Sequence, residues 1–184
     1  MTAHPADVIT FWRQAGPKRW FAKSAAFDDA IRLKFEPTHH AAARGGYDAW
    51  IESAEGALAL LILLDQFPRN LYRGSAHSYA TDPLARFFAR SALAQGHDRA
   101  MEPLLRGFFY LPFEHSENLP DQDRSVALCE AMQRETGEPG NLKWAIEHRD
   151  IIVRFGRFPH RNHALGRDTT PEEQAFLDEG GFAG

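Results

Sequence analysis

The sequence predicts an all-α protein built from antiparallel helix pairs. Apolar residues recur at helical spacing along most of the chain, as Phe27, Ile31 and Phe35 do at every fourth position. No convincing segment shows the period-two alternation of a β-strand. Hydrophobic residues make up 43% of the chain and aromatic residues 12%, which is enough for a sizeable core. Because no linker or low-complexity segment divides it, we expect a single helical domain over residues 1–184.

The N-terminal quarter is expected to hold two helices. The first begins near Val8 and is broken at 16–17, a Gly-Pro pair that a helix does not continue through. Residues 18–21 form a short aromatic hinge. The second helix extends from about Ser24 through Ala43.

A third helix begins near Ser53 and is apolar on all sides over residues 57–64. A helix without a polar face is normally surrounded by other helices, so we expect this one at the centre of the fold. Pro68 lacks the amide that would bond to the carbonyl of Leu64, which predicts a kink or a stop at that point.

Further helices are expected over residues 82–93, 98–111, 121–135 and 141–154, with a last one from 170. Asp82 is interpreted as an N-cap, with Pro83 at the first helical position. Residues 170–173 read Thr-Pro-Glu-Glu, which combines a capping residue, a first-turn proline and a returning glutamate.

One short phrase occurs twice, in residues 65–74 and in residues 155–167. Each copy places Phe-Pro, then Arg-Asn, then a glycine at the end of an expected helix. Such a turn presents arginine and amide groups that can hold an anion, and it can equally pin two turns together. Both interpretations remain open at this point.

Charge is uneven along the chain, although the formal net charge is only −4 and gives no reason to expect nucleic acid or a membrane as a partner. Residues 149–167 hold five arginines and one acid, whereas residues 114–138 hold seven acids and two arginines. These stretches can be two faces that neutralise each other or one exposed anion site.

A single cysteine, Cys129, excludes an internal disulfide and a cysteine-based zinc site. It lies in an apolar helical stretch, where a small buried side chain is expected. The N-terminus shows no secretory leader, and the longest apolar block is too short to cross a bilayer. We therefore expect a cytoplasmic protein.

Several phrases taken together resemble the bacterial domain-of-unknown-function family 924 over nearly the whole chain. They are Phe11-Trp12, Lys18-Arg19-Trp20-Phe21, residues 64–70, residues 79–85, His115-Ser116-Glu117, residues 148–152 and residues 158–162. The resemblance implies an all-α fold related to tetratricopeptide-like helical arrays, either as a bundle or as a short array. It implies no particular activity, substrate or cofactor. The 34-residue period of such arrays does not occur in the sequence.

The first functional hypothesis is a helical binding protein that holds a small anionic ligand or an acidic peptide in a cleft. Asp65 with Arg69, and Asp150 with Arg154, are spaced four apart, so each pair can share a helix face and form an ion pair. An arginine has five N–H donors and can satisfy an aspartate while it binds a second anion. The expected ligand-binding residues are Asp65, Arg69, Asn70, Arg154, His160, Arg161 and Asn162, with Arg19 and Trp20 as a basic and aromatic addition.

The second hypothesis is a small metal-independent hydrolase or lyase, and whether the protein is an enzyme stays open. Its acid–base pair would join His115 or His148 to Glu117 or Asp150. The same residues include metal-ligand types, yet none of their spacings is a metal motif. No nucleotide-binding loop or nucleophile elbow occurs in the sequence either. We therefore expect no metal and no cofactor.

The third hypothesis is a structural or assembly protein without a small-molecule site. It predicts an apolar surface patch on the final helix, around Phe176 and Leu177 and the tail at Phe182. The oligomeric state does not follow from the sequence.

Overall fold

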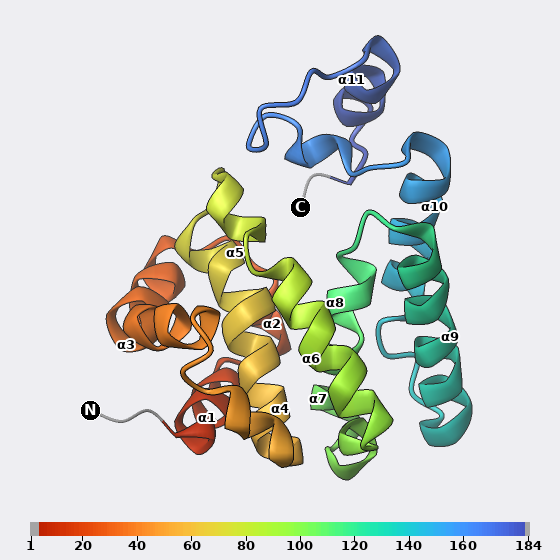
Figure 1. Cartoon of the computed structure of the whole chain (residues 1–184). Helices are drawn as coiled ribbons and strands as arrows, with labels where there is room; N and C mark the ends of the chain where they lie inside the picture. The colour runs from red at the N-terminus through yellow and green to blue at the C-terminus, as the bar shows by residue number, and fades with distance from the viewer. Residues whose placement is uncertain (1–3, 183–184) are drawn as a thin grey trace. The chain divides into compact units, whose positions relative to one another are not determined.

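A computed structural model describes residues 4–182, which form helices and turns without a β-strand (Figure 1). The prediction of an all-α fold is confirmed. Contacts divide the chain into two compact units. Unit 1 contains the described residues up to Arg73 together with His77–Pro112, and unit 2 contains Gly74–Ala76 and the described residues from Phe113 onward. The expected single domain over residues 1–184 stays a prediction, as does a tetratricopeptide-like arrangement.

Unit 1 contains seven helices that lie wholly within it among the described residues. They are α1 (Pro5–Ala15), α2 (Pro17–Trp20), α3 (Ala25–Ala43), α4 (Ala54–Leu61), α5 (Phe67–Leu71), α6 (Asp82–Ala94) and α7 (Pro103–Arg106). The hydroxyl of Ser24 accepts a hydrogen bond from the Phe27 amide and caps α3, as the sequence predicts. Single 3-10 turns follow or separate these helices, at η1 (Asp48–Glu52), η3 (Ala76–Tyr79), η4 (His97–Ala100) and η5 (Gly107–Phe109).

The core of unit 1 surrounds α4, and the apolar run over residues 57–64 is buried as predicted. Trp12 of α1 is fully buried beside it. The Trp12 ring stacks on Trp20 with centroids 5.9 Å apart. The Phe67 and Phe108 rings contact the Trp12 ring edge-on, with centroids 5.7 Å and 5.6 Å from its centroid. This aromatic cluster fixes α1 and α2 against the centre of the unit.

Where the sequence predicts a kink or a stop at Pro68, a π-helical turn, η2 (Ile62–Gln66), joins α4 to α5. The Phe67 amide bonds to the carbonyl of Ile62, five residues earlier. Pro68 has no amide N–H to donate to the Leu64 carbonyl. That carbonyl accepts a hydrogen bond from the Thr81 hydroxyl instead, at 2.5 Å. Thr81 therefore supplies the donor that the proline removes, and the chain stays helical.

The expected helix over 98–111 is wrong. Residues 97–100 form the 3-10 turn η4, and the backbone is extended at Met101 before Pro103 opens α7. Pro103 lacks the backbone N–H that would continue the preceding helix, although a proline fits the first position of a new one. Asp98 instead accepts a 2.8 Å hydrogen bond from the Tyr110 hydroxyl. Burial, together with this bond to Asp98, raises the pKa of Tyr110 above its ordinary value.

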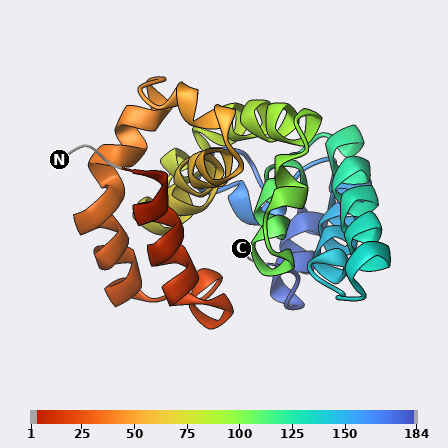
Figure 2. The same cartoon turned by 90° about the horizontal axis from the view of Figure 1, so that it is seen from below.

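Unit 2 is built on a helical hairpin of α9 (Leu119–Thr136) and α10 (Leu142–Phe155), which lie side by side in both views (Figures 1 and 2). The short helix α8 (Leu111–Glu114) precedes it, and the 3-10 turn η6 (Pro159–Arg161) and α11 (Pro171–Asp178) follow. The predicted capping box of α11 is confirmed. The N-cap position of α6 is Thr81 rather than the expected Asp82.

No helix among residues 4–182 is both long enough and apolar enough to cross a bilayer. The cytoplasmic location stays a prediction.

Candidate functional site

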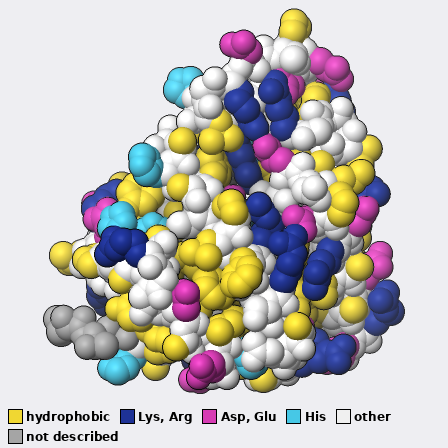
Figure 3. Space-filling view, in the orientation of Figure 1, with side chains coloured by type: hydrophobic (Ala, Val, Ile, Leu, Met, Phe, Trp, Pro, Cys, Tyr) yellow, Lys and Arg dark blue, Asp and Glu magenta, His cyan; other side chains and the backbone are white. Residues whose placement is uncertain are grey.

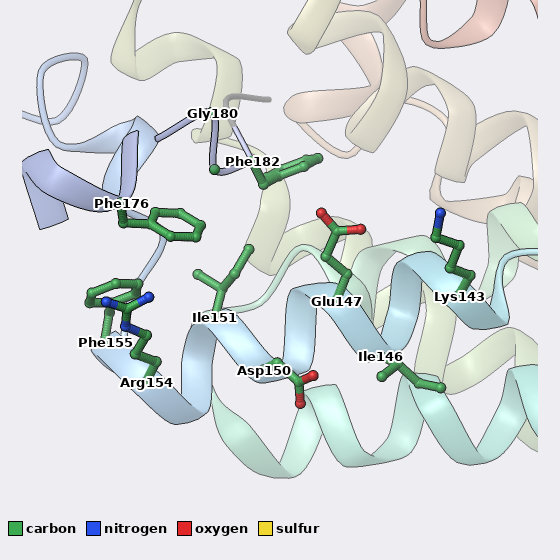
Figure 4. A pocket seen from close by; sticks show the side chains of 11 residues that line it. Lys143, Ile146, Glu147, Asp150, Ile151, Arg154, Phe155, Phe176, Gly180 and Phe182 are labelled. Atoms are coloured by element: carbon green, nitrogen blue, oxygen red, sulfur yellow. The ribbon is translucent and has the colours of Figure 1, made fainter. Parts of the chain in front are cut away.

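A groove of about 400 Å³ lies on unit 2, between α10 and the segment that runs from α11 to Phe182 (Figure 4). Its lining residues are Lys143, Ile146, Glu147, Asp150, Ile151, Arg154, Phe155, Phe176, Gly180, Gly181 and Phe182. This volume suits a small molecule or a few residues of peptide.

Apolar side chains form the floor of the groove. Ile151 packs in the core of unit 2, and Phe155, Phe176 and Phe182 are partly buried against that core. The Phe155 and Phe176 rings have centroids 5.1 Å apart. The close return of the chain depends on Gly181, because a Cβ atom there would lie 2.5 Å from the Phe176 ring. Phe176 and Phe182, two residues of the predicted assembly patch, thus face a concave site.

Arg154 stands at the edge of this floor with its side chain 49% exposed. Its guanidinium lies over the Phe155 ring at 4.5 Å and over the Phe176 ring at 5.6 Å. One long contact of 3.4 Å joins its Nε to Glu172. The expected ion pair with Asp150 does not form among the described residues, and Asp150 approaches Arg149 at 4.0 Å instead. Arg154 is therefore oriented by the two rings and keeps terminal N–H donors for a ligand.

Glu147 lies seven residues before Arg154 on α10. It points to the same side of the helix as Ile151, toward Phe182, whereas Asp150 projects from another side (Figure 4). Glu147 is half-buried and has no ion pair or hydrogen bond among the described residues. Lys143 lies over the ring of Trp144 at 5.2 Å. The groove thus has the basic Arg154 near one end, the acidic Glu147 further along and the basic Lys143 beyond it.

The predicted residues Asp65 and Arg69 form a partly buried cluster in unit 1. Arg69 donates two hydrogen bonds to Asp82, at 2.9 and 3.0 Å, and one to the Asp65 carbonyl at 2.5 Å. Its guanidinium also lies 3.3 Å from the Asp65 carboxylate. Burial alone would lower the pKa of Arg69, but Asp65 and Asp82 raise it above the ordinary value. Most of this arginine's donors already bind the protein's own oxygen atoms.

Asn70 is part of the same unit and donates to the Asp28 carboxylate at 2.7 Å. Asp28 also receives two hydrogen bonds from Arg73, at 2.6 and 3.0 Å. The first copy of the repeated phrase therefore ties α3 to α5 in the structure.

The second copy of the phrase, in unit 2, places Asn162 in a fully buried position. Its amide donates to Glu173 at 3.1 Å, and its carbonyl oxygen accepts from Arg167 at 3.0 Å. Arg161 is buried with its guanidinium 4.4 Å from the Phe158 ring centre, and the His160 ring lies 5.6 Å from that ring. These three predicted residues lie inside unit 2 and do not line the groove.

Two comparisons with known proteins bear on this chain. The family described as "Bacterial protein of unknown function (DUF924)" matches residues 8–181. The chain belongs to this family. A solved structure, "Structure of Protein of Unknown Function ATU0120 from Agrobacterium tumefaciens", is 54% identical with a TM-score of 0.89. The similarity covers 95% of this chain and 97% of that chain. No curated protein matches the sequence.

The remaining predicted residues of this DUF924 chain, Arg19 and Trp20, lie in unit 1. Trp20 is buried and its indole N–H donates to the Trp12 carbonyl at 2.6 Å. Arg19 is exposed on α2. Neither residue lines the groove of unit 2.

Among the predicted acid–base residues of the DUF924 chain, His148 has a carboxylate partner on the neighbouring helix α8. His148 is buried and pairs with Glu114 at 3.5 Å. Its Nδ1 also lies 2.8 Å from the Trp144 carbonyl oxygen. The His115 ring is 6.3 Å from the His148 ring. None of these groups lines the groove.

Glu117, another of the expected acid–base residues, accepts hydrogen bonds from neighbouring parts of unit 2. It binds Arg167 at 2.7 and 3.0 Å and accepts the Phe158 amide at 2.8 Å. Burial would raise the pKa of Glu117, but these hydrogen bonds lower it below the ordinary value.

The two oppositely charged stretches of the DUF924 sequence neutralise each other in part. Arg149 binds Asp123 at 2.6 Å, and Arg167 binds Glu117. On the face seen in Figure 3, acidic side chains lie among the basic ones rather than apart from them. Among the described residues, no group of three or more His, Cys, Asp or Glu side chains is arranged to hold a metal ion.

Glu173 is a buried carboxylate of unit 2 that accepts several hydrogen bonds. It receives two hydrogen bonds from Arg157, at 2.6 and 2.8 Å, and one each from Asn162 and the Thr170 amide. The hydrogen bond from Arg157 is the main cause that lowers the pKa of Glu173 to about 2. The ionised carboxylate thus holds α11 to the turn before it.

We expect the stability advantage of the wild type over Glu173→Gln to depend on pH. Because the pKa of Glu173 is lower in the folded protein, its contribution is complete above about pH 4.5 and decreases as pH falls toward about 2. Urea unfolding of both proteins between pH 7 and pH 3 measures this difference. Glu172→Gln, at the exposed neighbouring position, should show almost no such trend, and a difference that stays constant with pH for Glu173→Gln would contradict the assignment.

Proposed function

We propose that this protein is a binding module that holds a small anionic ligand or the carboxyl end of a peptide in the groove of unit 2. The observation that supports it is the position of Arg154, whose guanidinium lies over two rings at the edge of an apolar floor with donors to spare. A planar guanidinium can bind a carboxylate through two parallel N–H bonds. The contacts with Phe155 and Phe176 lower the entropy lost when it does so.

The rest of the groove defines the kind of anion. Ile151, Phe176 and Phe182 offer apolar surface for the body of the ligand. Glu147, the acidic side chain that points to the same side of α10 as Ile151, repels a second negative charge placed beyond Arg154. The ligand is therefore expected to have one anionic group and an apolar body, which fits a peptide ending in a hydrophobic residue better than a polyphosphate.

Arg154→Gln should weaken the binding of the probe N-acetyl-Ala-Leu-Phe by about fivefold, or about 1 kcal/mol, because one partly exposed ion pair is lost. Chemical-shift titration of the full chain measures the affinity. The carboxyl-amidated form of the same probe should bind the wild type as weakly as the acid form binds Arg154→Gln.

Arg134→Gln is the matched control. Arg134 is an exposed arginine of α9, it pairs with Glu130 at 3.6 Å, and it does not line the groove. It should leave the affinity for the probe unchanged. Equal binding of the acid and amide probes to the wild type, or an Arg154→Gln variant that binds as tightly as the wild type, would count against the proposed function.

A further inference from the structure

We propose that the groove selects a zwitterionic peptide of about three residues, which lies along α10 with its carboxylate at Arg154 and its amino group at Glu147. This inference rests on the proposed function, since it takes Arg154 as the carboxylate partner. It adds a second contact, between Glu147 and the amino group, and it specifies the length of the peptide and the direction in which the peptide lies.

The first step of the argument is the charge of Glu147. This carboxylate is half-buried on the groove and has no cationic partner among residues 4–182. Lys143 is placed four residues before it on α10, at a spacing that allows an ion pair. The Lys143 ammonium lies over the Trp144 ring instead. The protein leaves this carboxylate without a cationic partner, and apolar surface lies beside it. Such a site favours a ligand that brings a positive charge.

The second step is the distance between the two charged residues. Glu147 and Arg154 are seven residues apart, which is two turns of α-helix or about 10 Å along the axis. An extended peptide spans about 3.3–3.6 Å per residue, so three residues place the two termini at this separation. A single amino acid is too short to contact both groups, and a longer peptide has to bulge away from the floor.

The third step is the surface between the charges. Ile151 lies on α10 between Glu147 and Arg154, and Phe176 and Phe182 line the groove with it (Figure 4). The middle and last side chains of a bound tripeptide would meet this apolar floor. Hydrophobic side chains at those positions, as in Ala-Leu-Phe, therefore suit the groove, and the two opposite charges fix the direction of the chain.

The test compares Ala-Leu-Phe with its N-acetylated form on the full chain by chemical-shift titration. Removing the positive charge should weaken binding to the wild type by about three- to fivefold. The two peptides should bind equally to Glu147→Gln, and Glu147→Lys should prefer the acetylated form. Glu130→Gln, an exposed position on α9 outside the groove, should keep the wild-type preference. The dipeptide Leu-Phe should bind more weakly than the tripeptide.

The outcomes separate this inference from the proposed function. If the free and acetylated tripeptides bind the wild type equally, while the amidated one binds more weakly, the anion site stands and the zwitterion site is overturned. If Leu-Phe binds as tightly as Ala-Leu-Phe, the length is overturned. Loss of binding of every peptide to the wild type would overturn both proposals, and the one-dimensional proton spectrum of each variant shows whether it is folded.

Discussion

Arg69→Met is expected to lower the free energy of unfolding by about 3–5 kcal/mol, because it leaves two buried carboxylates without their shared cation. The Asp65 side chain is 1% exposed and the Asp82 side chain is 7% exposed, so water cannot replace the guanidinium. Urea unfolding at pH 7, followed by circular dichroism, measures the change.

Two further variants test the reason for this loss. Arg134→Gln removes an arginine from an exposed pair and should change stability by no more than about 0.5 kcal/mol. Adding Asp65→Asn and Asp82→Asn to Arg69→Met should restore part of the stability, since the two buried negative charges are then gone. An Arg69→Met variant as stable as the wild type would show that these carboxylates do not need the arginine.

Trp12→Ala is expected to cost about 3–5 kcal/mol, since it removes the largest fully buried side chain of the aromatic cluster in unit 1. The rings of Trp20, Phe67 and Phe108 would lose their common contact and surround a cavity. The same unfolding experiment measures this loss.

Phe21→Ala is the matched control for Trp12→Ala. The Phe21 ring belongs to the same cluster, 6.4 Å from Phe108, but the residue is 62% exposed. It should cost less than about 1 kcal/mol, because little apolar surface returns to water. If the two substitutions have similar effects, burial of Trp12 does not govern the stability of this cluster.

The helices could be predicted where local signals decide them. The capping box at residues 170–173 and the all-apolar run at 57–64 both specify their elements without help from distant residues. The error over residues 98–111 has two causes. Its apolar spacing is helical, but Pro103 is a local signal that starts a new helix, and Asp98 is held by Tyr110. Of these two, the contact between Asp98 and Tyr110 leaves no periodic trace in a sequence.

The site could be predicted only in part, because its geometry depends on which partner each charged group selects. The spacing of Asp65 and Arg69 indicates their contact correctly, whereas Asp82 comes from another helix and was not assigned as a partner. Arg154 has an aspartate at the same spacing, but its guanidinium lies over the rings of two phenylalanines instead. Glu147 resembles an ordinary solvated glutamate in the sequence, and its spacing from Ile151 and Arg154 was the signal that could have identified the groove.

The π-helical turn over Ile62–Gln66 changes the rotational position of the side chains that follow it. Each extra residue in a helix advances the following side chains by about 100° around the axis. The number of residues in this turn thus sets the direction in which Phe67 and Arg69 face. Deleting one residue before Asp65 would turn the guanidinium away from Asp82, even though all the remaining side chains are unchanged.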